Sequence, residues 1–145
     1  MGILQKIKLQ PLALDQYFNE PCVKKQIILH HTASSPDPYG VLRWWASTPE
    51  RVATAFVIGG KPINKSSNWK DGELLQCFGS DKYAWHLGLT SAHLKAGNPG
   101  AKSNTELNKM SIGIEICNFG GLTKTNKGYT TYVGSIIPDA EVIDA

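Results

Sequence analysis

An apolar run that ends in two histidines, Ile27-Ile28-Leu29-His30-His31, constrains this chain more than any other segment. Three consecutive aliphatic residues favour a strand in the interior of a sheet. A partly buried imidazole needs a hydrogen-bonding or metal partner. A strand that ends in this way is suited to place a metal ligand or an acid–base group at the rim of a sheet. The run alone leaves a second interpretation open, in which one histidine is satisfied in the core and the other is exposed.

Length, charge and cysteine content fit one ordinary domain. The chain has 145 residues, a formal net charge of +3 and three cysteines, at positions 22, 77 and 117. No apolar stretch reaches the about 18 residues that a membrane span needs. The basic residues are too scattered to form a nucleic-acid footprint. The first residues lack the apolar core of a secretory signal, so we expect synthesis in the cytoplasm. An odd number of widely spaced cysteines predicts reduced thiols, not a disulfide framework.

Hydrophobic patterns and turn residues predict an α/β fold with a central mixed β-sheet flanked by helices. The expected strands cover residues 24–31, 53–58, 73–78 and 111–118. A helix is expected over residues 39–46, with Trp44 and Trp45 as either a sugar-stacking platform or core residues. Residues 90–108 are rich in Ser, Gly, Asn and Lys and predict a loop that exposes His93.

The segment Ser111–Asn118 alternates in a way that predicts two different faces. Its three isoleucines share one face, whereas Gly113 and Glu115 share the other. Glutamate is depleted in strands, and an apolar setting raises its pKa toward neutrality. Glu115 is therefore a candidate general base, with a solvated carboxylate on an edge strand as the alternative.

A third segment, Ala84-Trp85-His86-Leu87-Gly88, places a tryptophan beside a histidine ahead of a glycine. This pattern suits a turn that presents both rings to a cleft. Packing of the histidine against the aromatic ring is the alternative that the segment alone leaves open.

Taken in order along residues 24–120, these segments resemble the zinc-dependent N-acetylmuramoyl-L-alanine amidase family. The resemblance rests on His30-His31-Thr32-Ala33, Phe56-Val57-Ile58, Asp71–Gln76, Ala84–Gly88 and Ser111–Asn118. The family includes phage amidases, bacterial cell-wall recycling amidases and animal peptidoglycan recognition proteins. Small size and the lack of a signal sequence most resemble a phage endolysin. On this basis we expect a lead segment over residues 1–23 and an amidase-like catalytic domain over 24–145.

The resemblance implies a role for each matching residue. It makes His30 a ligand of a catalytic Zn²⁺ and Glu115 the general base that acts on the metal-bound water. It implies substrate binding by three aromatic residues: His31, Trp85 and His86. Thr54 stands where some members carry a tyrosine, so Glu115 would carry more of the proton transfer. The implied reaction is hydrolysis of the amide between N-acetylmuramic acid and L-alanine in bacterial peptidoglycan, at the cell wall.

The chain departs from the family at its end. The family supplies two further zinc ligands there, a histidine and then an aspartate or cysteine, whereas this sequence has no histidine after His93. Three explanations stay open. In the first, the chain is the front part of a longer protein. In the second, it is a non-catalytic domain that binds peptidoglycan or forms a structural part of a virion. Alternatively, it rebuilds a zinc site from His30, His86 and either Cys117 or Asp139.

Overall fold

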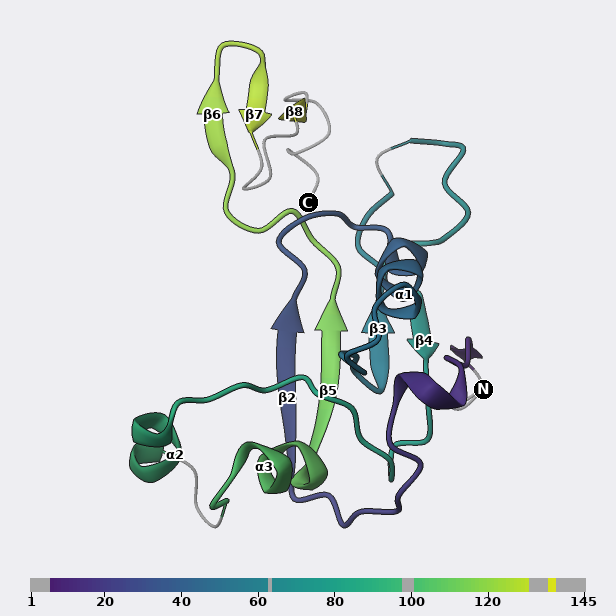
Figure 1. Ribbon diagram of the computed structural model, residues 1–145. Coiled ribbons are helices and arrows are strands. Elements are labelled where there is room, and N and C mark those ends of the chain that lie inside the picture. Colours follow the sequence, from purple (N-terminus) through teal and green to yellow (C-terminus); the bar gives the residue numbers. More distant parts are fainter. Residues whose placement is uncertain (1–5, 63, 98–100, 131–135, 138–145) are drawn as a thin grey trace.

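A five-stranded mixed sheet forms the centre of the protein (Figure 1), whose computed structural model describes residues 6–62, 64–97, 101–130 and 136–137. In sequence order its strands are Ile7–Leu9 (β1), Gln26–His31 (β2), Phe56–Ile58 (β3), Leu74–Gln76 (β4) and Ser111–Ile116 (β5). In space the order is β1-β4-β3-β5-β2, with only the β3–β4 pair antiparallel. The predicted fold class is therefore confirmed.

Three helices and a small second sheet complete the described fold. The helices are Pro38–Ala46 (α1), Ser91–Gly97 (α2) and Asn104–Met110 (α3), with a 3₁₀ turn at Leu14–Gln16 (η2). The second sheet consists of Thr123–Thr125 (β6), Gly128–Thr130 (β7) and Ile136–Ile137 (β8). Within the described residues, no helix is long and apolar enough to cross a membrane.

Helix α1 forms where the sequence predicts it, because its ends carry strong signals. The Asp37 carboxylate accepts a hydrogen bond from the Tyr39 N–H, and Pro38 occupies the first turn. The helix points Trp45 into the core at 3% exposure and leaves Trp44 58% exposed. The tryptophan pair is thus divided between core packing and the surface.

The central sheet has two unlike faces, which the strand register defines. One, here called the site face, carries His30 of β2, Gly113 and Glu115 of β5, Val57 of β3 and Leu75 of β4. Helix α1 and the segment after β4 lie across this face (Figure 1), and Val57 and Leu75 are completely buried. The site face therefore contains the main core.

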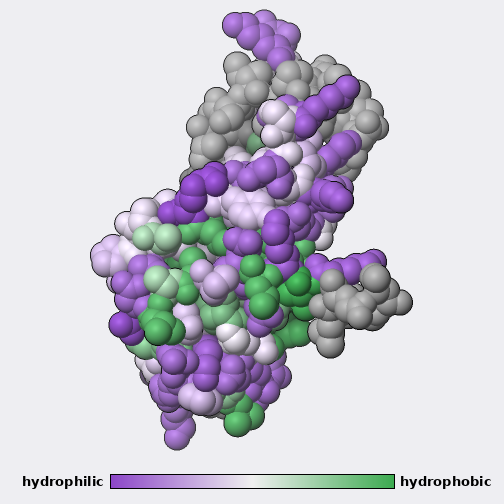
Figure 2. Space-filling view, turned by 90° about the vertical axis from the view of Figure 1, so that its right-hand side faces the viewer, coloured by the Kyte–Doolittle hydropathy of each residue, from purple (hydrophilic) through white to green (hydrophobic). Residues whose placement is uncertain are grey.

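The opposite face, here called the open face, is lined mainly with apolar side chains, several of which are exposed to solvent. Its residues include Leu9, Ile27, Leu29, Phe56, Ile112, Ile114 and Ile116. Ile27 is 61% and Leu29 63% exposed, while the three isoleucines of β5 are partly buried. Figure 2 views the flank on which β1 and β4 lie and shows hydrophobic residues reaching the surface there.

Two sequence predictions need correction. Residues 90–108 are not a loop, because they contain α2 and α3, and His93 is exposed on a helix. The Ser103 hydroxyl accepts from the Glu106 N–H and caps α3, and this spacing is a helix-start signal that outweighs the polar composition. The strand predicted from residue 53 begins only at Phe56, because Ala53 bonds through its N–H to Trp85 and leaves the ladder.

The N-terminal region contributes directly to the central sheet. β1 lies within the expected lead segment, and its residues Ile7–Leu9 pair with Leu74–Gln76. Further along, Phe18 bridges to Tyr83, and their rings stack with centroids 4.6 Å apart.

Candidate active site

Two imidazoles meet on the site face. His30 comes from the end of β2 and His86 from the segment after β4, and their Nε2 and Nδ1 atoms are 2.9 Å apart. The rings are perpendicular, with centroids separated by 5.1 Å. Because one of these nitrogens must donate and the other accept, the pair forms one hydrogen-bonded unit. The sequence motifs that contain these histidines are thus brought together across 56 residues of chain.

Burial keeps this pair neutral. Desolvation lowers the pKa of His30. It also lowers the pKa of His86 to about 4, and the proximity of His30 acts in the same direction. Near neutral pH, both rings therefore offer a lone pair and an N–H group instead of a positive charge.

Glu115 lies beside the imidazoles as the register partner of His30. Burial raises the pKa of its carboxyl to about 6, and the nearby His31 partly opposes this shift. A carboxyl with this pKa is largely ionised at pH 7 and can still release a bound proton readily. It has the properties of a general base that later acts as an acid.

Gly113 makes room for the His86 ring on the sheet. A methyl group at this position would come within 3.0 Å of the His86 Cγ and Nδ1 atoms and within 2.9 Å of the Thr54 Cγ2 atom. The ring consequently lies directly against the backbone of β5. The His86 Nε2 atom is buried and has no hydrogen-bonding partner among the described residues, so the ring is held by its Nδ1 atom and its backbone.

Glu115 lines two adjoining pockets. The smaller has a volume of about 130 Å³ and is also lined by His30, His86 and Trp85. The larger, of about 570 Å³, extends toward α1 and is lined by His31, Asp37 and the exposed Trp44, among others. A ligand in the larger pocket would therefore reach the carboxylate and the imidazole pair from the α1 side.

The other candidate residues take more peripheral positions. His31 is exposed at the end of β2, where its Nδ1 atom is 3.3 Å from the Asn118 Oδ1 atom. The Trp85 ring contacts Phe18 and Tyr83 edge-on, with centroids 5.3 and 6.0 Å away. Thr54 is buried and donates its hydroxyl to the Phe56 carbonyl. Both His31 and Trp85 keep contact with the pockets.

The described residues do not provide a complete metal site. No group of three His, Cys, Asp or Glu side chains within them is arranged to hold a metal ion. Cys117 is 1% exposed, and burial raises the pKa of its thiol to about 12. The thiol does not form a group of three ligands with His30 and His86. Asp139, the other predicted ligand, lies outside the described residues. His30 and His86 alone do not fit a bound zinc.

Sequence reasoning missed Asn104 and Asn108 of α3. Asn108 is fully buried, and its side chain bonds to the backbone of His86 and Leu87. The Ser103-x-x-Glu106 spacing could have revealed the helix that carries both asparagines. Nothing in the sequence alone indicated that they face the His86 segment.

A mixed sheet that brings two imidazoles and a half-buried carboxylate to the wall of a pocket is the arrangement of an acid–base site. The chain belongs to the N-acetylmuramoyl-L-alanine amidase family (Amidase_2), whose sequence profile matches residues 20–137. The family suggested by the motifs is thereby confirmed. No curated protein sequence matches this chain.

Two solved structures illustrate the similarity of the fold. PlyL has 17% sequence identity and a TM-score of 0.53 over 79% of this chain and 60% of its own. A mutant endolysin from Bacillus subtilis has 21% identity and a TM-score of 0.51, over 79% of this chain and 63% of its own. Identities this low show a shared fold alone. The present chain spans about three fifths of the length of these structures.

Proposed function

We propose that the protein hydrolyses the amide bond between N-acetylmuramic acid and L-alanine in bacterial peptidoglycan, as an endolysin-type enzyme at the cell wall. The observation that carries this proposal is the position of Glu115. Its half-buried carboxyl adjoins the His30–His86 pair and lines both pockets, in a chain of the amidase family.

Glu115 is the proposed general base. With a pKa of about 6, the ionised carboxylate can accept a proton from an attacking water and then pass it to the leaving amine. Thr54 is no substitute for an acid–base group, because its aliphatic hydroxyl does not ionise near neutral pH and its hydrogen already bonds to the Phe56 carbonyl. The proton transfer therefore depends on Glu115.

The larger pocket is the proposed binding site for the muramyl peptide. The exposed Trp44 indole can stack on a pyranose ring, while Asp37, which already pairs with Arg43, and Ser34 add polar groups. We propose that His31 contacts the substrate at the rim of this pocket, and that Trp85 and His86 line the smaller one.

Zinc is the cofactor that the family resemblance implies, and His30 is the ligand we propose for it. The described residues bring no third ligand to the imidazole pair. We therefore expect stable zinc binding to require a side chain from outside the described residues.

The test measures the release of new N-terminal L-alanine amino groups from purified peptidoglycan by the 145-residue chain, with Zn²⁺ added. Glu115→Gln should slow the release at least about 100-fold, because it removes the acid–base group. His30→Ala should abolish it together with any bound zinc. His93→Ala, which changes an exposed residue of α2, is the matched histidine control. Release by Glu115→Gln at the wild-type rate would overturn the assignment.

The incomplete ligand set favours a second candidate, a module that binds peptidoglycan without cleaving it. This candidate predicts that the wild-type chain sediments with cell walls and releases no amino groups. Substitution of Trp44 by Ala should then weaken sedimentation, because the larger pocket would be the binding site in both cases. Cleavage by the wild-type chain would exclude this alternative.

A further inference from the structure

Asn108 is a buried polar residue whose whole side chain is committed to hydrogen bonds. Its Oδ1 atom accepts from the N–H groups of His86 and Leu87, at 2.9 and 3.0 Å. Its Nδ2 atom donates to the carbonyls of Leu87 and Asn104, at 2.9 and 2.8 Å. The residue is 0% exposed, so each of these bonds replaces contact with water that the amide has lost.

Asn104 repeats this arrangement one helical turn earlier. Its Oδ1 atom accepts from the Leu89 N–H at 2.8 Å, and its Nδ2 atom donates to the Leu89 carbonyl at 2.9 Å. Residues four apart lie on one face of a helix, so both amides of α3 face residues 86–89. Among the described residues, no backbone–backbone hydrogen bond holds this stretch. The two asparagines bond to it as a neighbouring strand would.

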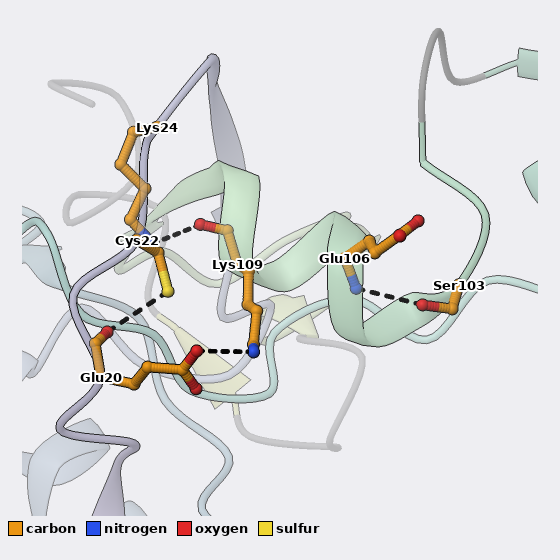
Figure 3. Close-up of polar contacts among 6 residues, drawn as sticks. All are labelled: Glu20, Cys22, Lys24, Ser103, Glu106 and Lys109. Atoms are coloured by element: carbon orange, nitrogen blue, oxygen red, sulfur yellow. Dashed lines mark hydrogen bonds and ion pairs between the residues drawn. The ribbon is translucent and has the colours of Figure 1, made fainter.

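Helix α3 is itself fixed, which allows it to hold another segment. Figure 3 shows Ser103 accepting from the Glu106 N–H at the start of the helix, and Lys109 contacting Glu20 and Lys24 at its end. The Lys24 ammonium donates to the Lys109 carbonyl at 2.8 Å, and the Lys109 ammonium lies 2.8 Å from the Glu20 carboxylate. Both ends of this short helix are thus tied down.

The helix also connects the two halves of the site. α3 ends at Met110, and β5 begins at the next residue. β5 carries Gly113, against which the His86 ring rests, and Glu115. Asn108 therefore joins the backbone of His86 to the same rigid unit that positions the carboxylate.

We propose that Asn108, assisted by Asn104, is a positioning residue that holds the His86 imidazole against His30 and beside Glu115. The effect on catalysis rests on the proposed amidase function, whereas the effect on the His86 segment does not. Since the His86 Nε2 atom has no partner, the backbone of His86 is the main restraint on the ring apart from the His30 contact. Without Asn108, residues 86 and 87 lose their hydrogen-bond acceptor and the ring loses its fixed distance to β5.

The test is amide hydrogen exchange of the 145-residue chain, followed by NMR at single residues. In Asn108→Ala, the amides of His86 and Leu87 should exchange at least about tenfold faster, while the Leu89 amide, held by Asn104, should change less. In Asn108→Asp, one acceptor oxygen is retained, but an ionised carboxylate cannot donate to the Leu87 and Asn104 carbonyls as the Nδ2 atom does. The protection of His86 and Leu87 should therefore be restored only in part, and only at a pH low enough to protonate the new carboxyl. Leu107→Ala is the matched control, because it removes a buried side chain from the same helix that makes none of the hydrogen bonds to residues 86–89.

Faster exchange confined to His86 and Leu87 in Asn108→Ala supports the proposal. A change spread evenly over α3 and β5, equal to that in Leu107→Ala, would overturn it and leave Asn108 a purely structural residue. Amide-bond cleavage supplies the second readout, in which Asn108→Ala should lower kcat more than it raises KM. If the wild-type chain does not cleave peptidoglycan, the proposed function fails, and the exchange pattern still decides the role of Asn108.

Discussion

The two faces of the central sheet use similar residues and end in opposite environments. Leu75 on the site face is 0% exposed, whereas Leu29 on the open face is 63% exposed. Both are leucines in strands of the same sheet. The candidate catalytic groups lie on the buried face, and the open face carries aliphatic side chains.

This difference accounts for the shifted pKa values of the candidate catalytic groups. Desolvation by the covering segments raises the pKa of Glu115 and lowers that of His86. Such shifts need a low-dielectric environment, which a solvent-exposed face does not provide. The alternation of β5 thus places the candidate base Glu115 on one side of the strand and three isoleucines on the other.

The largest expected effect compares leucines on the two faces. Leu75→Ala should lower the free energy of unfolding by about 2–5 kcal/mol, because it leaves a cavity in the core. Leu29→Ala should change it by about 0.5 kcal/mol or less, since the side chain is mostly in water. Urea denaturation of both variants measures the difference. Equal losses would mean that the open face is covered in solution.

A smaller effect is expected at the glycine beneath His86. Gly113→Ala should cost about 1–3 kcal/mol of stability, because the new methyl group overlaps the His86 ring and Thr54. It should also disrupt the His30–His86 hydrogen bond, which the NMR signals of the imidazole nitrogens report. Gly121→Ala is the matched control, since a methyl group there meets nothing within 4 Å. Identical imidazole signals in Gly113→Ala and the wild type would contradict the close approach.

Local sequence patterns predicted the elements whose apolar residues follow the periodicity of a helix or a strand. β2, α1 and the alternation of β5 carry their own signals, namely an apolar run, a capped amphipathic segment and a two-residue period. α3 was missed because Leu107 and Met110 are the only apolar residues among its seven, although Ser103 caps it. β3 is shorter than predicted because the Ala53 N–H bonds to the Trp85 carbonyl and not to a neighbouring strand. This contact is distant in sequence, so no local pattern predicts it.

The site was predictable to a similar extent. The motifs containing His30, His86 and Glu115 indicated three chemical groups, and the fold brings them together. The role of Asn108 depends on which segment crosses α3, so it could be recognised only from the structure. His86 and Asn108 are 22 residues apart in the chain, and neither local sequence pattern indicates that the two residues form a hydrogen bond.

The smallest predicted effect is the pH dependence of stability that Glu115 confers on the site face. Its folded-state pKa is about 6, above the ordinary value of 4.5, so the fold favours the protonated carboxyl. The resulting stabilisation is fully present below about pH 4.5 and is lost as the pH rises through about 6. Glu115→Gln carries a neutral amide at every pH. The variant should therefore gain stability relative to the wild type between pH 4.5 and pH 7.5, while the contribution of His86 cancels in the comparison.

Urea denaturation of both chains at a series of pH values measures this gain. A difference that stays constant across the range would show that the carboxyl is as well solvated in the folded chain as in the unfolded one, and the contrast between the two faces would then not extend to Glu115.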